Sequence, residues 1–201
     1  MKTKIILASK SNIRINLLKN TGVPFTSIGS NYDESIIQTE YTKVKQNIET
    51  VKTMVYKLAL EKAKNISKDH QEDIVIGCDQ VLLFDDKIFL KPKSIKESVS
   101  QLKQLSGNIH NLVTGTLCIK NEREVWHYIS VQEMKMRKLS DEYIGNYIKS
   151  MNDKIFSVLG GYEIETIGIN LFEKIGKDLF SIQGISILEL LVFLRSEGYI
   201  E

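Results

Sequence analysis

The stretch IVIGCDQVLLFDDKIFLK, Ile74–Lys91, predicts the centre of the fold. Its first eleven residues are almost wholly apolar, which is typical of one long buried strand, or of two strands separated by a kink at Gly77. Asp85 and Asp86 predict a turn, and residues 87–90 predict a second strand that returns beside the first. The stretch therefore predicts a central β-hairpin with a long inner strand.

A carboxylate, Asp79, lies in the middle of this apolar run and is followed by Gln80. An ionised carboxylate is costly to bury unless it is paired, hydrogen-bonded or bound to a cation. The hairpin brings Lys91 back along the strand, so we expect Lys91 and Asp79 to face one cleft. Two interpretations stay open here, a structural ion pair and a functional pair in a site.

The composition is that of an ordinary globular protein. The 201 residues are 42% hydrophobic and 26% charged, which predicts one domain spanning 1–201. A net charge of +2 indicates no nucleic-acid partner. The apolar residues 5–8 are too few for a signal peptide or a membrane span, so we expect a cytoplasmic protein without a membrane partner. Cys78 and Cys118 have no second Cys or His at metal-ligand spacing, so no zinc site is indicated.

Hydrophobic periodicity and turn residues predict alternating strands and helices, which favours an α/β fold. We expect strands at residues 4–8, 25–28, 74–84, 87–90, 109–120, 124–137 and 167–172. We expect helices at 13–20, 42–66 and 94–105, a further helix that starts at 140, and a last one from 186 to about 198.

The first helix carries a feature that points to an anion. Ser9 and Ser11 precede it, and Arg14 lies in its first turn, where a cation opposes the helix dipole. Free N–H groups, hydroxyls and a guanidinium at a helix N-terminus are suited to phosphate. The alternative is an Arg14 side chain that reaches solvent or a neighbouring acid.

Two further charged features lie between this helix and the hairpin. Asp33 and Glu34 are adjacent acids in a polar loop, and such acids are usually solvated. Lys62 lies near the buried stripe of the long helix, where a lysine more often extends to solvent than inward. Carboxylates beside a basic phosphate clamp favour hydrolysis of a phosphoanhydride with a divalent metal, in which an acid takes a proton from water. The chain contains neither a P-loop nor a GxGxxG motif.

Eight short motifs occur in an order that resembles the Maf family of nucleoside triphosphate pyrophosphatases over nearly the whole chain. They are ASKSNIR (8–14), Asp33-Glu34, Lys62-Ala63, GCDQV (77–81), Lys91-Pro92, LSG (105–107), Thr114-Gly115 and GINLFE (168–173). Each motif is weak alone, and their order and spacing carry the resemblance.

The resemblance implies a fold, an activity and a set of site residues. The fold is an elongated mixed β-sheet flanked by helices, with two lobes around a central cleft, as in Maf and ITPase-like proteins. The implied activity is hydrolysis of a nucleoside triphosphate between its α- and β-phosphates, and we expect a homodimer. Asp79 is then the catalytic base, and Glu34 and Asp79 hold a divalent Mg, Mn or Co ion. The residues expected to bind the triphosphate are Ser9, Ser11, Arg14, Lys62 and Lys91.

Three residues bear on the base that is bound. The pair Asp79-Gln80 is similar to the family branch that hydrolyses 7-methyl-GTP, whereas the UTP/dTTP branch usually has Asp-Thr. Glu165 falls where the first branch carries a specificity glutamate, but Ile13 replaces a Trp or Arg that is usual in the family. We therefore expect 7-methyl-GTP. The alternatives are a UTP/dTTP pyrophosphatase and a non-catalytic nucleotide-binding regulator of cell division.

Overall fold

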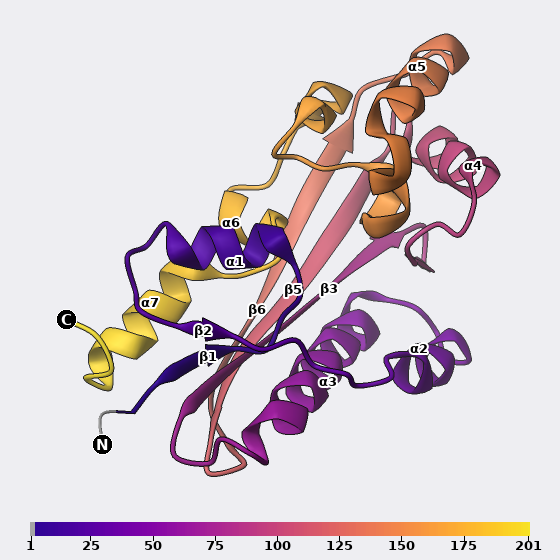
Figure 1. Cartoon of the computed structure of the whole chain (residues 1–201). Helices are drawn as coiled ribbons and strands as arrows, with labels where there is room; N and C mark the ends of the chain where they lie inside the picture. Colours follow the sequence, from indigo (N-terminus) through magenta and orange to yellow (C-terminus); the bar gives the residue numbers. More distant parts are fainter. Residues whose placement is uncertain (1–2) are drawn as a thin grey trace.

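The computed structural model describes residues 3–201 as a mixed seven-stranded sheet with helices on both faces (Figure 1). The strands are β1 (Ile5–Leu7), β2 (Thr26–Ser27), β3 (Ile74–Phe84), β4 (Lys87–Phe89), β5 (Ile109–Lys120), β6 (Arg123–Met136) and β7 (Phe172–Lys174). The α-helices are α1 (Asn12–Lys19), α2 (Ser35–Thr42), α3 (Ile48–Ser67), α4 (Ile95–Leu105), α5 (Asp141–Met151), α6 (Leu179–Ile182) and α7 (Ile187–Ser196). Short 3₁₀ helices span Asn152–Ser157, Leu159–Gly161 and Ile167–Leu171.

The sheet order is β2-β1-β3-β5-β6-β7, with β4 paired to β3. β1 runs parallel to β2 and β3, and the other pairings are antiparallel. The three long strands β3, β5 and β6 connect two lobes (Figure 1). One lobe contains α1, α7, β1 and β2, and the other contains α4, α5 and the 3₁₀ helices. The expected elongated mixed sheet with helices around it is confirmed.

Alternation along β3 distributes its side chains between two cores. Val81 and Leu83 pack with helices α2 and α3 on one face of the sheet. Ile74, Ile76 and Cys78 pack with α1 and α7 on the other face. β3 is buried on both faces because helices cover both, which explains its nearly continuous apolar sequence. It is one uninterrupted strand, so the alternative of a kink at Gly77 is wrong.

Helix α3 lies close to the sheet because small residues face it. A Cβ on Gly77 would lie 2.2 Å from the carbonyl oxygen of Ala59 and 2.9 Å from the Cβ of Ala63. A Cβ on Gly115, the β5 residue opposite Asp79, would lie 3.1 Å from the carbonyl oxygen of a residue in α3. The absence of side chains at these two glycines therefore lets the helix approach the strand beside Asp79.

The middle of β3 has an open edge. On the side opposite β5, β1 pairs with β3 only as far as Ile76, and β4 begins to pair at Leu82. Among residues 3–201, no strand pairs with residues 77–81 on that side. This gap between β1 and β4 is the place where the two lobes leave the central strand accessible.

Two segments differ from the expected elements. The expected helix at 42–66 starts later, at Ile48, because Asn47 caps α3 by accepting a hydrogen bond from the backbone N–H of Thr50 at 3.0 Å, and α2 (Ser35–Thr42) is a helix that was not expected. The expected strand at 167–172 is mostly a 3₁₀ helix, in which a Cβ on Gly168 would lie 2.2 Å from the carbonyl oxygen of Glu163. Across the described chain, no helix is both long and apolar enough to cross a membrane.

Candidate active site

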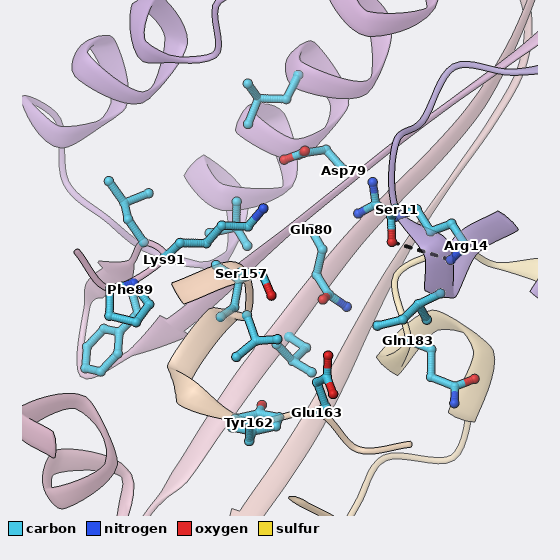
Figure 2. A pocket seen from close by; sticks show the side chains of 18 of the residues that line it. Ser11, Arg14, Asp79, Gln80, Phe89, Lys91, Ser157, Tyr162, Glu163 and Gln183 are labelled. Carbon is cyan, nitrogen blue, oxygen red and sulfur yellow. Dashed lines mark hydrogen bonds between the residues drawn. The ribbon is translucent and has the colours of Figure 1, made fainter. Parts of the chain in front are cut away.

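Two adjoining cavities of about 490 and 630 Å³ open along the exposed edge of β3. They share much of their lining, including Arg14, Lys62 and Glu165, so they form one cleft. Figure 2 shows Ser11 and Arg14 on one side of Asp79 and Gln80, with Lys91 and Phe89 on the other. Volumes in this range are typical of small-molecule sites.

A chain of three charged groups is the buried centre of the cleft. Lys62 Nζ donates to Asp79 Oδ1 in a short hydrogen bond and contacts Glu34 Oε1 at 2.8 Å. Asp79 is 6% exposed, whereas the Glu34 side chain is 42% exposed and lies towards the mouth of the cleft. Each residue comes from a different element: Asp79 from β3, Lys62 from α3, and Glu34 from the start of α2.

The surroundings shift the pKa of both members of the buried pair. Burial raises the pKa of the Asp79 carboxyl, and the charges of Lys62 and Arg14 oppose that rise. Burial lowers the pKa of the Lys62 ammonium, but the attraction of Asp79 and Glu34 outweighs this, and the net pKa is raised. Lys62 is therefore charged at neutral pH, and Asp79 holds a proton more readily than an exposed aspartate.

This pairing corrects two expectations. Lys62 points inward rather than to solvent, because α3 lies close to the sheet at Gly77. Lys91 lines both cavities as expected, but it is not the ion-pair partner of Asp79 within residues 3–201. β4 ends at Phe89, so Lys91 has already left the sheet and its side chain is exposed.

The start of α1 forms one wall of the cleft. Ser11 caps the helix by accepting from the backbone N–H of Arg14 at 3.5 Å, and its own N–H donates to Ser9 Oγ at 3.1 Å. The Arg14 guanidinium crosses to β3, where Nη1 donates to the carbonyl oxygen of Cys78 at 2.9 Å. It therefore reaches neither bulk solvent nor a neighbouring acid as its primary partner. Ser9 is buried and lines the second cavity only.

The opposite wall comes from the segment after α5. Tyr162 and Ile164 are buried, and Glu163 and Glu165 alternate with them and line both cavities. Burial raises the pKa of Glu165, and the charge of Glu163 adds to the rise. Within residues 3–201, neither carboxylate has a salt-bridge partner. Ile13 lies in the same cleft and contributes an apolar surface.

Gln80 lines the cleft, but its amide nitrogen is already bonded to protein. It lies on the face of β3 opposite to Asp79 (Figure 2) and contacts the last two residues of α6, Ser181 and Ile182. Both residues line the same cleft because the cleft opens at the strand edge rather than on one face of the sheet.

Two carboxylates of the cleft, those of Asp79 and Glu34, are of the type that binds a divalent cation. Asp79 and Glu34 share Lys62, and residues 3–201 contain no group of three or more His, Cys, Asp or Glu side chains placed to hold a metal. Mg²⁺ is commonly held by one or two carboxylates together with substrate phosphates. The two carboxylates fit a cation that binds jointly with a triphosphate, and they do not form an all-protein metal site.

Several cleft residues were missed from the sequence: Glu163, Gln183, Lys154, Phe156 and Ser157. Glu163 had a usable signal, because the alternation Tyr-Glu-Ile-Glu at 162–165 is typical of an extended segment with both acids on one face. Lys154, Phe156 and Ser157 lie in a short 3₁₀ helix and Gln183 follows α6, so the direction of these side chains depends on tertiary packing.

The open strand edge, the buried lysine–carboxylate pair and the cationic wall form a site suited to a small phosphorylated ligand. The chain belongs to the Maf-like protein family, whose model matches residues 4–197. It is 37% identical over its full length to the whole of a 7-methyl-GTP pyrophosphatase of Brucella abortus. It is 36% identical, again with full coverage of both chains, to a nucleoside triphosphate pyrophosphatase of Ruegeria pomeroyi.

A solved nucleoside-triphosphatase, described as a dITP/XTP pyrophosphatase of Mycobacterium abscessus, aligns with 68% of this chain and 76% of its own. The sequence identity is 17% and the TM-score is 0.41.

Proposed function

We propose that this protein is a nucleoside triphosphate pyrophosphatase that hydrolyses the bond between the α- and β-phosphates, with 7-methyl-GTP as the favoured substrate. The observation that carries the proposal is the buried Asp79 carboxylate, held by Lys62 at the bottom of a cleft lined by Arg14 and Lys91. Membership of the Maf-like family and the printed names of its relatives support it.

Asp79 is the proposed general base. It takes a proton from water, the water oxygen bonds to phosphorus, and the bridging P–O bond breaks to release pyrophosphate and a nucleoside monophosphate. Burial raises the carboxyl pKa and makes the carboxylate a stronger base, while Lys62 keeps a substantial share of it ionised. Lys62 thus limits the rise in the pKa of Asp79, so that the carboxylate is a stronger base than usual and is still available in its ionised form.

We propose that the carboxylates of Asp79 and Glu34 would help to hold a divalent Mg, Mn or Co ion when substrate is bound. When bound, such an ion supplies positive charge that stabilises the transition state and the leaving pyrophosphate. Glu34 is suited to this role because its carboxylate lies at the cleft mouth and reaches Lys62 at 2.8 Å.

The triphosphate is proposed to lie against α1, Arg14 and Lys91. The helix start offers free backbone N–H groups, and Ser11 holds that turn in place. The hydroxyl of Ser9 accepts from the Ser11 N–H and so shapes the turn from behind. A guanidinium and an ammonium on opposite sides of the cleft then match the charge of a triphosphate.

The base is proposed to lie by Glu163 and Glu165. A 7-methylguanine ring carries a positive charge, so two unpaired carboxylates attract it more than neutral guanine in a partly desolvated cleft. A carboxylate also accepts hydrogen bonds from the N1–H and amino group of guanine. Ile13 offers no cation–π contact, which is worth about 0.5–2 kcal/mol, so the preference is smaller than an aromatic residue at that position would give.

The proposal is tested by measuring kcat/KM for 7-methyl-GTP, GTP, UTP and dTTP with Mg²⁺, Mn²⁺ and Co²⁺, and by identifying both products. We expect 7-methyl-GTP to be the best substrate and pyrophosphate to be released. Preference for UTP or dTTP would contradict the purine assignment, and release of inorganic phosphate would contradict the bond assigned. Tight binding without turnover would support the non-catalytic regulator instead.

A further inference from the structure

The amide of Gln80 holds the C-terminal end of α6. Gln80 Nε2 donates to the carbonyl oxygens of Ser181 at 3.0 Å and Ile182 at 2.9 Å, and to Thr114 Oγ1 at 2.9 Å. Thr114 Oγ1 in turn donates to the Ser181 carbonyl at 2.8 Å. Both Ser181 and Thr114 are buried. An amide nitrogen carries only two hydrogens, so these acceptors use its donor capacity and leave none for a substrate base.

The turn that continues from this end of α6 packs against the guanidinium of Arg14. Gly184 has a φ of +99°, and a Cβ on it would lie 3.0 Å from Nε and 3.2 Å from Nη2 of Arg14. A side chain at this position would crowd the guanidinium, and the positive φ also favours glycine. On its other side, Arg14 Nη1 donates to the carbonyl oxygen of Cys78.

These contacts close a ring. Cys78 and Gln80 are two residues apart on β3, so the strand holds the guanidinium directly through one residue and holds the segment packed against it through the other. A guanidinium fixed on both sides loses little conformational freedom when it binds phosphate.

We propose that Gln80 is a positioning residue for phosphate binding: by fixing residues 181–184 it keeps the Arg14 guanidinium in the orientation that receives the triphosphate. The inference rests on the proposed function, in which Arg14 contacts phosphate. It differs from the expectation that Gln80 reads the base. A positioning role lowers affinity for every nucleotide by the same factor, whereas a base-reading role changes the order of preference.

Tripolyphosphate, which has no base, separates the two roles. Its Kd is measured by calorimetry on the full chain for the wild type, Gln80→Met, Arg14→Ala and the double variant. Met keeps the length of Gln and removes its hydrogen bonds. We expect Gln80→Met to weaken binding about 10-fold, and to add less than about twofold in the Arg14→Ala background, because coupled residues are not additive. Gln71→Met makes the same chemical change at an exposed residue outside the cleft and serves as the control.

Hydrolysis of 7-methyl-GTP, GTP and UTP gives the second readout. We expect Gln80→Met to raise KM by one common factor and to leave the order of preference unchanged. An altered order with unchanged tripolyphosphate affinity overturns the proposal, as does an equal Gln80→Met effect with and without Arg14. If Gln80→Met does not fold, Thr114→Val removes the same anchor and must give the same pattern. If the wild-type protein binds tripolyphosphate but hydrolyses no nucleotide, the proposed function is refuted and the positioning role is not. If the wild-type protein does not bind tripolyphosphate, the positioning role is overturned.

Discussion

Replacing Lys62 by Met is expected to destabilise the protein, because it leaves Asp79 as a buried carboxylate without its nearest cation. The Asp79 and Lys62 side chains are 8% and 12% exposed, and removing one partner of such a pair typically costs about 3–5 kcal/mol. The charge of Arg14 still acts on the carboxylate. We therefore place the loss in the free energy of unfolding at the lower end, about 3 kcal/mol at neutral pH.

The loss depends on pH. Burial raises the pKa of Asp79 and Lys62 opposes this, so removing Lys62 raises the folded-state pKa further. A carboxyl group whose pKa is higher in the folded protein than in the unfolded chain binds its proton more tightly in the folded protein. At a pH below the pKa of the unfolded chain the group does not disfavour folding, and it destabilises the folded protein progressively as pH rises to the pKa of the folded state. The destabilisation is thus small below about pH 4, near the unfolded pKa, and complete above the raised folded pKa.

Urea unfolding between about pH 4 and pH 8 measures this effect. The double variant Lys62→Met/Asp79→Asn removes both charges, so it should recover most of the stability lost in Lys62→Met. Lys64→Met is the control: its side chain is 43% exposed and pairs with Glu61 on the helix surface, so it should lose less than about 0.5 kcal/mol. Equal stability of Lys62→Met and the wild type at neutral pH, or a loss that is the same at both ends of the pH range, would refute the reasoning.

Three other substitutions or profiles follow from the structure. Gly77→Ala places a Cβ 2.2 Å from the carbonyl oxygen of Ala59 and should cost about 1–3 kcal/mol in urea unfolding, whereas Gly145→Ala meets no atom within 4 Å and should not destabilise. Glu163→Gln should lower the ratio of kcat/KM for 7-methyl-GTP over GTP by about 5-fold, because it removes one of two carboxylates from the base wall. The acid limb of the kcat/KM profile should lie above about pH 4, because burial raises the pKa of Asp79.

Each of these has a contradicting result. Wild-type stability of Gly77→Ala would mean that α3 does not approach the strand closely. A Glu163→Gln ratio no different from that of Glu173→Gln, an exposed acid outside both cavities, would remove Glu163 from the base wall. Activity that persists below about pH 4 would exclude a base with a raised pKa.

The local sequence pattern was sufficient to predict the central strand β3 and the special role of Asp79 within it. The apolar run of β3 required burial on both faces, and the cost of a carboxylate inside it indicated a site at Asp79. The partner of Asp79 was not predictable in the same way. Lys62 and Lys91 are both lysines beside apolar segments, and the choice between them depends on how closely α3 approaches Gly77 and on where β4 ends. Both are tertiary facts without a local signature.

The role of Gln80 shows the same limit. Strand alternation puts Gln80 on the face of β3 opposite to Asp79, where it contacts α6. Its hydrogen-bond acceptors, the carbonyl oxygens of Ser181 and Ile182, are 101 and 102 residues further along the chain. No local sequence pattern therefore connects Gln80 with these acceptors. The cleft includes both Asp79 and Gln80 because β1 and β4 leave the strand edge open, a property of topology rather than of residue type.

The most direct test of the assignment of Asp79 as the base is the release of pyrophosphate by Asp79→Asn. Asn keeps the shape of the side chain and removes its ability to accept a proton. We predict that kcat/KM for the best nucleotide falls by about 10²–10⁴-fold, while the protein stays folded and its affinity for tripolyphosphate stays close to that of the wild type. A folded Asp79→Asn protein that releases pyrophosphate at the wild-type rate would contradict the account.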